Sequence, residues 1–147
     1  MENLQFERIC RYLRLQKQLG DQYDQYIARA GKRVDLSKPE TDVLLFLANN
    51  PQYNTARDVS ANRALSKTYV SKAVERLVLR GLLATEASAA DRRLQFLRLT
   101  PAAAAKVLAL RQAQADFFRH LTVGFSPENL MLLDRLLQQL QGNLDRL

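Results

Sequence analysis

The sequence predicts a mainly α-helical fold with one small β element late in the middle of the chain. Three observations support this prediction. Apolar residues recur every three or four positions over long stretches near both ends of the 147-residue chain. Prolines stand at several points where an apolar-periodic stretch begins, which is typical of helix starts. Two short apolar runs flank a polar loop between residues 82 and 99, as expected for a hairpin.

The first two helices are delimited by glycine, proline and asparagine. Residues 4–30 carry a helical apolar series, and Gly31 is the expected stop signal. Pro39 begins the next helix, and the acidic residues that follow it lie in the first turn, where the helix dipole favours negative charge. This helix is expected to end at the Asn-Asn-Pro sequence of residues 49–51.

The middle of the chain has the order of a winged helix-turn-helix. A short helix over residues 55–62 and a turn precede a second helix, which opens at the N-cap residue Ser66 and ends at Gly81. Strands are expected at residues 82–86 and 94–99, with the wing tip between them. We therefore expect a single domain, mainly α with a small β wing, in which residues 37–100 form the winged helix-turn-helix.

The last two helices repeat one start signal. Thr100-Pro101 and Ser126-Pro127 each place a hydroxyl N-cap before a proline and predict helices over residues 101–122 and 127–146. The last helix carries a wide leucine stripe. The terminal helices offer more apolar surface than a winged helix of roughly 60 residues covers, which favours a homodimer built from residues 1–36 and 101–147. The alternative is a monomer whose terminal helices fold over the winged helix.

Positive charge is concentrated on the predicted winged helix. The chain carries a net charge of +7. Residues 55–100 contain nine basic and four acidic residues, so 9 − 4 gives +5. The other 101 residues contain 13 basic and 11 acidic residues, so 13 − 11 gives only +2. This distribution favours double-stranded DNA as the partner.

The helix that opens at Ser66 divides into two faces on a helical wheel. The face expected to be buried carries Val70, Val74, Leu77, Val78 and Gly81. The opposite face carries Thr68, Tyr69, Lys72 and Arg76, with Lys67 and Ser71 at its flank. We expect Thr68, Tyr69 and Lys72 to contact base edges, and Lys67, Ser71 and Arg76 to contact phosphates. The alternative is a solvated amphipathic helix with incidental charge.

The wing tip carries two adjacent arginines. Arg92 and Arg93 follow Asp91 on the loop, and arginines on such a loop can enter the minor groove. Asp91 is expected to orient an arginine through a charge-assisted hydrogen bond rather than to contact DNA. The alternative is a solvated turn.

These residues resemble the multiple-antibiotic-resistance regulator (MarR) family of bacterial transcription factors. The resemblance is carried by residues 65–72 (LSKTYVSK), Leu77, residues 80–83 (RGLL), residues 91–93 (DRR) and residues 99–100 (LT). It implies a homodimer in which the first, fifth and sixth helices form the base. Each subunit would contact half of a pseudo-palindromic operator, with Arg93 as the wing-tip arginine and Asp91 as its partner. The chain departs from many members at Ala84-Thr85, where they carry an arginine.

The resemblance also implies a signal that changes operator affinity. In the family, small ligands often lie between the dimer base and the winged helix, and the residues that suit such a cleft here are Tyr12, Arg14, Tyr23, Tyr26 and His120. Cys10 is the residue for oxidation sensing, and an inert interface thiol is its alternative. The leading hypothesis is thus a repressor controlled by a small molecule or by oxidation. A winged helix that contacts only proteins is the competing hypothesis.

Several classes of protein are disfavoured by composition. One cysteine excludes an internal disulfide framework and fits a reducing cytosol, so a cytoplasmic location is expected. The sequence has no apolar run near the ~18–20 residues of a membrane span. A single histidine, no glycine-rich phosphate loop and no cluster of metal ligands argue against an enzyme. No cofactor and no metal are expected.

Overall fold

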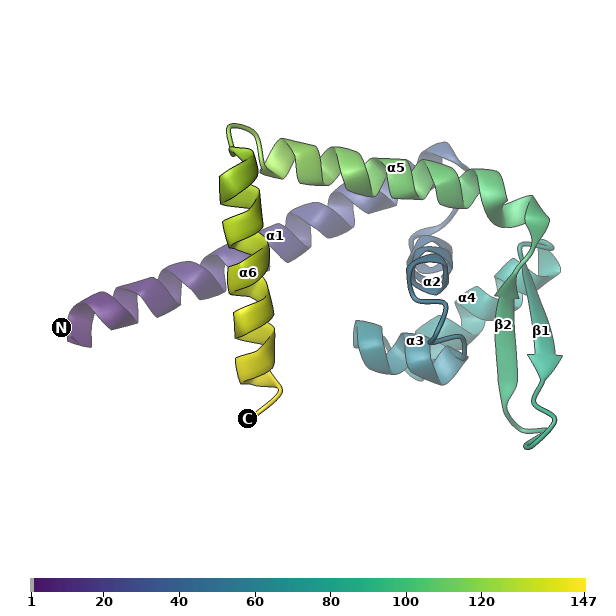
Figure 1. The fold of residues 1–147 in the computed structure, drawn as a ribbon. Helices are drawn as coiled ribbons and strands as arrows, with labels where there is room; N and C mark the ends of the chain where they lie inside the picture. Colours follow the sequence, from purple (N-terminus) through teal and green to yellow (C-terminus); the bar gives the residue numbers. More distant parts are fainter. Residues whose placement is uncertain (1) are drawn as a thin grey trace. The chain divides into compact units, whose positions relative to one another are not determined.

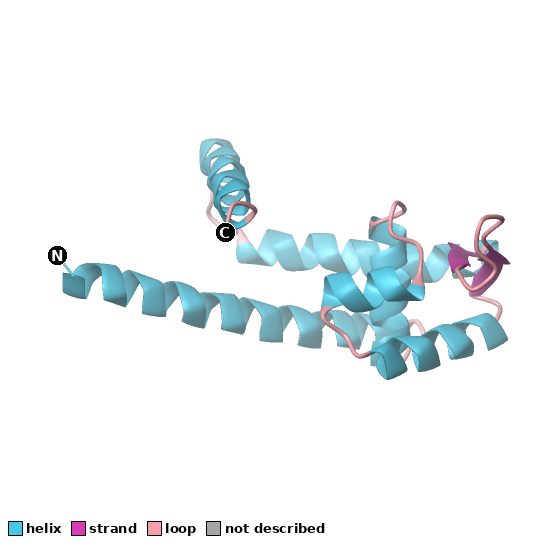
Figure 2. Cartoon of the chain, turned by 90° about the horizontal axis from the view of Figure 1, so that it is seen from below, coloured by secondary structure: helices cyan, strands magenta, loops and turns pink. Residues whose placement is uncertain are grey.

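A computed structural model describes residues 2–147 and confirms the mainly α fold with a small β wing (Figure 1). The elements in chain order are α1 (Glu2–Arg33), α2 (Lys38–Asn49), α3 (Ala56–Arg63), α4 (Lys67–Leu79), β1 (Leu83–Ala87), β2 (Gln95–Leu99), a short 3-10 turn η1 (Pro101–Ala103), α5 (Ala104–Leu121) and α6 (Pro127–Leu144). Figure 2 shows that the strands form a single ribbon with a loop at its end, and that helices make up nearly all the rest.

The chain divides into two compact units, residues 1–114 and residues 115–147. The hydrophobic core lies in the first unit, and its buried residues extend from Ile27 to Leu110. Helix α2 is the centre of this core, since all its residues from Glu40 to Ala48 are buried. It packs against α1, α3, α4 and β2. The winged helix is therefore assembled around α2.

The start of α2 is fixed by a capping box. The Ser37 hydroxyl accepts a hydrogen bond from the Glu40 backbone N–H at 3.3 Å, and the Glu40 carboxylate accepts one from the Ser37 N–H at 3.1 Å. Pro39 occupies the first turn, as the sequence predicted. These contacts satisfy backbone donors that the helix leaves unpaired, so α2 begins at a defined residue.

Gly31 does not end α1, contrary to the sequence prediction. The helix continues to Arg33, and a Cβ atom added at Gly31 would lie 2.1 Å from the Thr41 hydroxyl oxygen. The glycine is therefore needed for the close approach of α1 to α2. The reversal falls at Asp35, whose φ of 58° is left-handed, and the Leu36 N–H donates to the Gly31 carbonyl at 2.9 Å.

Helix α4 is turned relative to the predicted wheel. Val70, Ala73 and Leu77 are each at most 1% exposed, whereas Val78, expected on the buried side, is 37% exposed. The physical reason is that α4 packs against α2 and α3 on the side that carries Ala73, so this side chain is buried instead of Val78. Gly81, at φ 71°, follows the end of the helix.

The wing is a two-stranded antiparallel ribbon in which Leu83 pairs with Leu99 and Thr85 with Leu97. Leu97 is buried, and its N–H donates to the Asn54 carbonyl at 2.7 Å, which joins the wing to the loop before α3. Thr100 does not cap the next helix as predicted. Its hydroxyl donates instead to the Gly81 carbonyl at 2.5 Å, and the following turn is 3-10.

In the second unit, Ser126 caps α6 as predicted, because its hydroxyl accepts from the Asn129 N–H at 3.1 Å. Helix α6 has no buried residue. Its exposed large apolar side chains are Met131, Leu132, Leu136, Leu137, Leu140 and Leu144. Within residues 2–147 no helix combines the length and apolarity that crossing a membrane requires.

Candidate nucleic-acid interface

The outward face of α4 presents short polar and basic side chains. Lys67, Thr68, Ser71 and Lys72 are exposed on the first turns of the helix, and Arg76 is exposed in its last turn. The Ser66 hydroxyl caps the helix by accepting from the Tyr69 N–H at 3.1 Å, and the first turn contains no acidic residue. A helix end of this kind is complementary to anions.

The turn between α3 and α4 holds the two helices in a fixed arrangement. Ala64 adopts a left-handed conformation with φ 51°, and the Ser60 hydroxyl donates to the Leu65 carbonyl at 2.6 Å. Leu65 is half-buried against the core, and Val59 on α3 is fully buried. The outward face of α4 is thus displayed on a rigid base, as specific contacts require.

Tyr69 differs from its predicted role at a base edge. Its side chain is half-buried, and its hydroxyl donates to the Asp42 carboxylate of α2 at 2.9 Å. Burial, together with this hydrogen bond and the Asp42 charge, raises the pKa of the Tyr69 hydroxyl, so it remains a donor at neutral pH. The wheel places Tyr69 on the exposed side because its buried side includes Val74 and Val78 and leaves out Ala73, which is buried in the structure.

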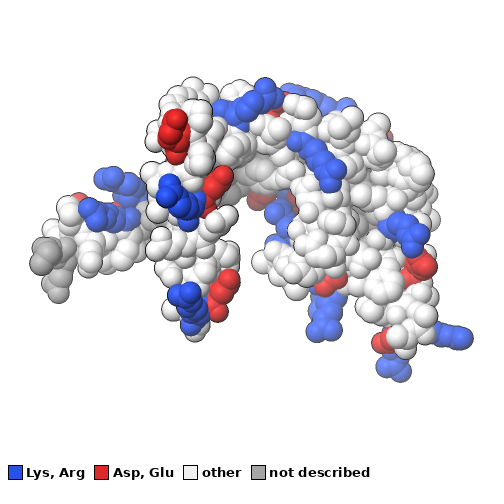
Figure 3. All heavy atoms as spheres, in the orientation of Figure 1, with Lys and Arg blue, Asp and Glu red and all other residues white. Residues whose placement is uncertain are grey.

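The arginines and lysines of residues 55–100 fall into two groups, those that form ion pairs within the chain and those that do not. Arg63, Arg80 and Arg98 form ion pairs with acidic residues of this chain. In the described part of the chain no ion pair engages the other six, which are all exposed: Arg57, Lys67, Lys72, Arg76, Arg92 and Arg93. In Figure 3, blue side chains project at the lower right, where Figure 1 places the tip of the wing.

The backbone of the wing tip is held by two of its own side chains, Ser88 and Asp91. The Ser88 side chain accepts hydrogen bonds from the Ala90 and Asp91 N–H groups at 3.2 and 3.3 Å. The Asp91 carboxylate accepts from the Arg93 N–H at 2.9 Å. Asp91 therefore fixes the backbone of the loop, whereas the prediction had it orient a guanidinium, and among residues 2–147 it forms no ion pair with Arg92 or Arg93. Both arginine side chains remain exposed.

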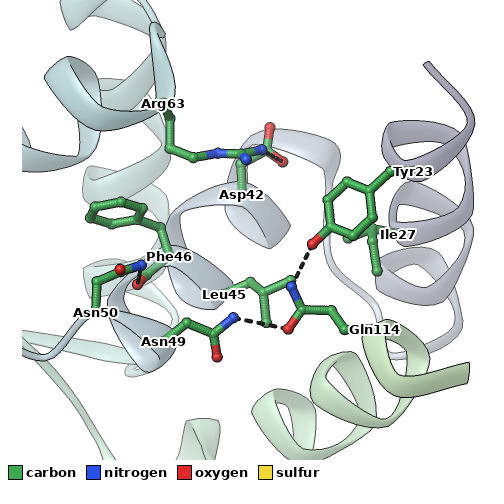
Figure 4. Close-up of a pocket in the computed structure, with 9 residues that line it drawn as sticks. All are labelled: Tyr23, Ile27, Asp42, Leu45, Phe46, Asn49, Asn50, Arg63 and Gln114. Atoms are coloured by element: carbon green, nitrogen blue, oxygen red, sulfur yellow. Dashed lines mark hydrogen bonds and ion pairs between the residues drawn. The ribbon is translucent and has the colours of Figure 1, made fainter. Parts of the chain in front are cut away.

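A pocket of about 210 Å³ lies within the first unit, beside α2 (Figure 4). Its lining residues are Tyr23, Ile27, Asp42, Leu45, Phe46, Asn49, Asn50, Arg63 and Gln114. Gln114 donates to the Tyr23 hydroxyl and accepts from the Asn49 amide at 2.9 Å. Ile27, Leu45 and Phe46 also line it, so the pocket combines apolar surface with a few oriented polar groups, as ligand sites do.

One wall of the pocket is charged. The Asp42 side chain is 4% exposed, and its carboxylate lies 2.5 Å from Lys38 Nζ and 3.7 Å from Arg63 Nη2. Arg63 and Lys38 also lie within 4.0 Å of the Asp24 carboxylate on α1. The negative charge of Asp42 is therefore compensated despite its burial. Figure 4 shows the Arg63 side chain extending along the pocket toward Asp42.

The residues predicted for a ligand cleft are dispersed. Tyr23 lines the pocket, and the neighbouring Tyr26 is half-buried with the Arg29 guanidinium 5.9 Å from its ring centre. Tyr12 and Arg14 are exposed on α1. His120 belongs to residues 115–147, where its Nδ1 lies 2.7 Å from the Asp116 carbonyl oxygen. Cys10 is a half-buried free thiol on α1.

Sequence reasoning missed the charged wall of the pocket. Asp42 was interpreted only as an acid near a helix start, and Arg63 only as part of the basic segment. One available signal was that Asp42 directly precedes the most apolar run of the chain, where a carboxylate needs a partner. Gln114 gave no signal, since its role depends on the path of α5. Within residues 2–147 no group of three or more His, Cys, Asp or Glu side chains is placed to hold a metal ion.

Comparison with known proteins finds similarity to transcription regulators. Residues 34–94 match the MarR family. The HTH-type transcriptional repressor IacR of Pseudomonas putida is 25% identical over 125 residues, which are 85% of this chain and 74% of that protein.

Solved structures share the fold. The transcriptional regulator PA3341 superposes with a TM-score of 0.78 at 22% identity, over 92% of this chain and 99% of that one. Bordetella bronchiseptica BpsR, whose DNA binding is regulated by 6-hydroxynicotinic acid, has a TM-score of 0.64 at 22% identity, over 87% of this chain and 91% of that one.

Proposed function

We propose that this chain, a member of the MarR family of transcriptional regulators, is a repressor that binds a pseudo-palindromic DNA operator as a homodimer. The observation that carries the proposal is the exposed face of α4 beside an ordered basic wing. Thr68 and Lys72 are assigned to base edges, and Lys67, Ser71 and Arg76 to phosphates. Arg92 and Arg93 are assigned to the minor groove next to the helix.

The homodimer is supported by unburied apolar surface on the terminal helices. On α1 the exposed apolar residues include Leu4, Phe6, Ile9 and Leu13, and on α6 no residue is buried at all. An apolar stripe of this extent is typical of an interface. A two-fold dimer would also present two copies of α4, which matches the symmetry of a palindromic operator.

Salt dependence tests the DNA contact. A duplex selected from genomic fragments should bind tightly at low salt, and the logarithm of its affinity should fall with a slope of about −0.9 per phosphate contact. Arg93→Ala should weaken binding without changing the melting temperature, because the side chain is exposed. Arg98→Ala is the control, since Arg98 is paired with Glu86. If no duplex binds at low salt, the winged helix serves protein contacts instead.

The pocket beside α2 is proposed as the effector site. A small aromatic acid fits its chemistry: Phe46 and Ile27 provide an apolar wall, and Arg63 provides a guanidinium for an anionic group. BpsR, which shares the fold, responds to an acid of this size. Calorimetry with a panel of small aromatic carboxylates that includes 6-hydroxynicotinic acid tests this. Binding should be lost in Arg63→Ala, and a wild-type protein that binds no member of the panel would contradict the assignment.

Cys10 supports oxidation as the other route of control, because its thiol is partly accessible. Peroxide should then release the operator from the wild-type protein and not from Cys10→Ser. Unchanged wild-type binding after peroxide would end this route.

A further inference from the structure

The N-terminal turn of α4 is joined to the pocket by one carboxylate. Asp42 lines the pocket and also accepts the hydrogen bond of the Tyr69 hydroxyl at 2.9 Å. Tyr69 lies one residue after Thr68 and three residues before Lys72, so it belongs to the same turn as the proposed base contacts. A shift in the position or charge compensation of Asp42 would therefore affect the turn of α4 that is assigned to operator contacts.

Arg63 is the pocket residue through which a ligand can alter the charge compensation of Asp42. Its guanidinium reaches acidic oxygens only at 3.7 and 4.0 Å, which are ion-pair distances but too long for hydrogen bonds. Lys38, by contrast, holds Asp42 at 2.5 Å. Arg63 side-chain exposure is 35%, so its donors face the pocket partly desolvated. A ligand oxygen that pairs with Arg63 would displace the looser of the two cations that neutralise Asp42.

We infer that Tyr69 is a positioning residue that reports the state of the pocket to the recognition helix, with Asp42 as the shared acceptor and Arg63 as the group that a ligand engages. This inference rests on the proposed function. Withdrawal of Arg63 removes one of the cations that compensate the buried Asp42 carboxylate, and an uncompensated charge is costly in the interior. The carboxylate lowers this cost by rearranging around Lys38, which contacts Oδ1, and this disturbs the Tyr69 hydrogen bond at Oδ2. The first turn of α4 is then held less firmly, and operator affinity falls.

The opposite end of α4 shows why this connection is specific to the pocket. There Arg80 Nη1 lies 2.5 Å from the Glu40 carboxylate and Nη2 donates to the Asp35 carbonyl at 2.7 Å. Neither Arg80 nor Glu40 lines the pocket. The C-terminal end of α4 is thus fastened to the α1–α2 turn independently of pocket occupancy.

A double-mutant cycle on operator affinity tests the inference without a ligand. Arg63→Ala imitates withdrawal of the guanidinium and should weaken operator binding about tenfold, a typical size for coupling between two sites. In a Tyr69→Phe background the same substitution should have less than a twofold effect, because the connection is already cut. Arg57→Ala is the control: it removes an exposed cation from the same helix, α3, and should cost the same factor in both backgrounds.

Equal losses for Arg63→Ala in both backgrounds would overturn the inference, since they would mean that Arg63 contacts DNA directly. A wild-type protein that binds no genomic fragment would instead refute the proposed function. A measurement on the free protein covers the case in which Tyr69→Phe does not bind DNA. Carbon-13 NMR of labelled tyrosine at neutral pH, with the Tyr69 signal assigned by Tyr69→Phe, should show that signal shift in Asp42→Asn, because the hydroxyl loses its charged acceptor. An unchanged signal would show that Asp42 does not hold the hydroxyl, and would also overturn the inference.

Discussion

The winged helix and the C-terminal helix contain the same kinds of apolar residue but differ in whether these residues are buried. In α2 every side chain from Val43 to Ala48 is buried. In α6, where leucines are more frequent, no residue is buried. The winged helix buries its apolar side chains within one chain. Helix α6 instead has a wide apolar face that is exposed to water in a single copy.

This difference separates folding from association. Burial contributes about 25 cal/mol for each Å² of apolar surface removed from water, and the first unit has already gained this contribution. The apolar face of α6 stays exposed in the single chain, so the same contribution is available to the proposed homodimer. We therefore expect substitutions in the winged helix to change the free energy of unfolding, and substitutions on α6 to change the association of subunits.

The largest effect should come from a charge on the apolar face of α6. Leu137→Glu would place an unpaired carboxylate in the proposed dimer interface, at a cost of about 3–5 kcal/mol. Sedimentation should show a monomer at concentrations where the wild type is a dimer. Gln138→Glu adds the same charge next to it on an exposed polar residue and should leave the dimer intact. A Leu137→Glu protein that remains dimeric would place the interface elsewhere.

The next largest effect should be on folding of the winged helix. Leu77 is completely buried on α4, so Leu77→Ala should lower the free energy of unfolding by about 2–5 kcal/mol, through lost burial and the cavity left behind. Leu79 lies two residues further on the same helix and is 81% exposed. Leu79→Ala should change stability by about 0.5 kcal/mol or less. Urea denaturation of the two variants measures the contrast, and equal losses would contradict the burial of Leu77.

A smaller effect should separate the two regions in DNA binding. Lys72→Ala should weaken operator binding by about 1–3 kcal/mol if this lysine contacts a base, and it should reduce discrimination against altered operators. Arg135→Ala removes a positive charge from α6 and should leave affinity unchanged. Fluorescence anisotropy with labelled duplex measures both. Comparable losses would mean that the operator contacts the second unit as well.

The smallest effect concerns pH and the packing of α2. Burial raises the pKa of the Glu40 carboxyl, but hydrogen bonds from Ser37 and Arg80 and the Arg80 charge outweigh it, so the pKa lies below its usual value of 4.5. A carboxyl with a lowered pKa in the folded state stabilises the protein above about pH 4.5, and this stabilisation is lost as the pH falls through the lowered value. Glu40→Gln should therefore flatten the acid side of the stability profile measured by thermal unfolding. A profile identical to that of the wild type would contradict the Arg80 contact.

Local signals predicted most of the fold correctly, and the errors occurred where two helices meet. Ser66 and Ser126 act as N-caps because a hydroxyl next to its own helix start depends only on neighbouring residues. The local sequence predicts a stop signal at Gly31, because the contact of this glycine with Thr41 is ten residues away and on another helix. The burial of Ala73 in place of Val78 has the same origin, since a helical wheel does not show how much space a neighbouring helix leaves at each position.

The candidate site divides in the same way. The outward basic residues of α4 and the wing arginines were identified from sequence, because recognising an exposed charged residue does not require knowledge of its contacts in the fold. For Asp91 the structure shows a contact that the sequence did not predict, since its carboxylate accepts a hydrogen bond from the Arg93 backbone N–H. Tyr69, expected on the exposed side, is half-buried because its hydroxyl contacts Asp42 of α2. The pocket was almost entirely missed, because it depends on side chains from α1, α2, α3 and α5 that only the fold brings together.

The sequence by itself determined the order of elements, the helix starts, the hairpin and the concentration of basic residues, since each follows from contacts within a few residues or from composition. Tertiary structure alone decided which face of α4 is buried, where α1 ends, which arginines are neutralised, and that Asp42 connects a pocket to the recognition helix. The physical reason is range. Capping and turn conformation act between neighbours, whereas close packing and charge compensation depend on residues such as Tyr23, Arg63 and Gln114, which only the folded chain brings together.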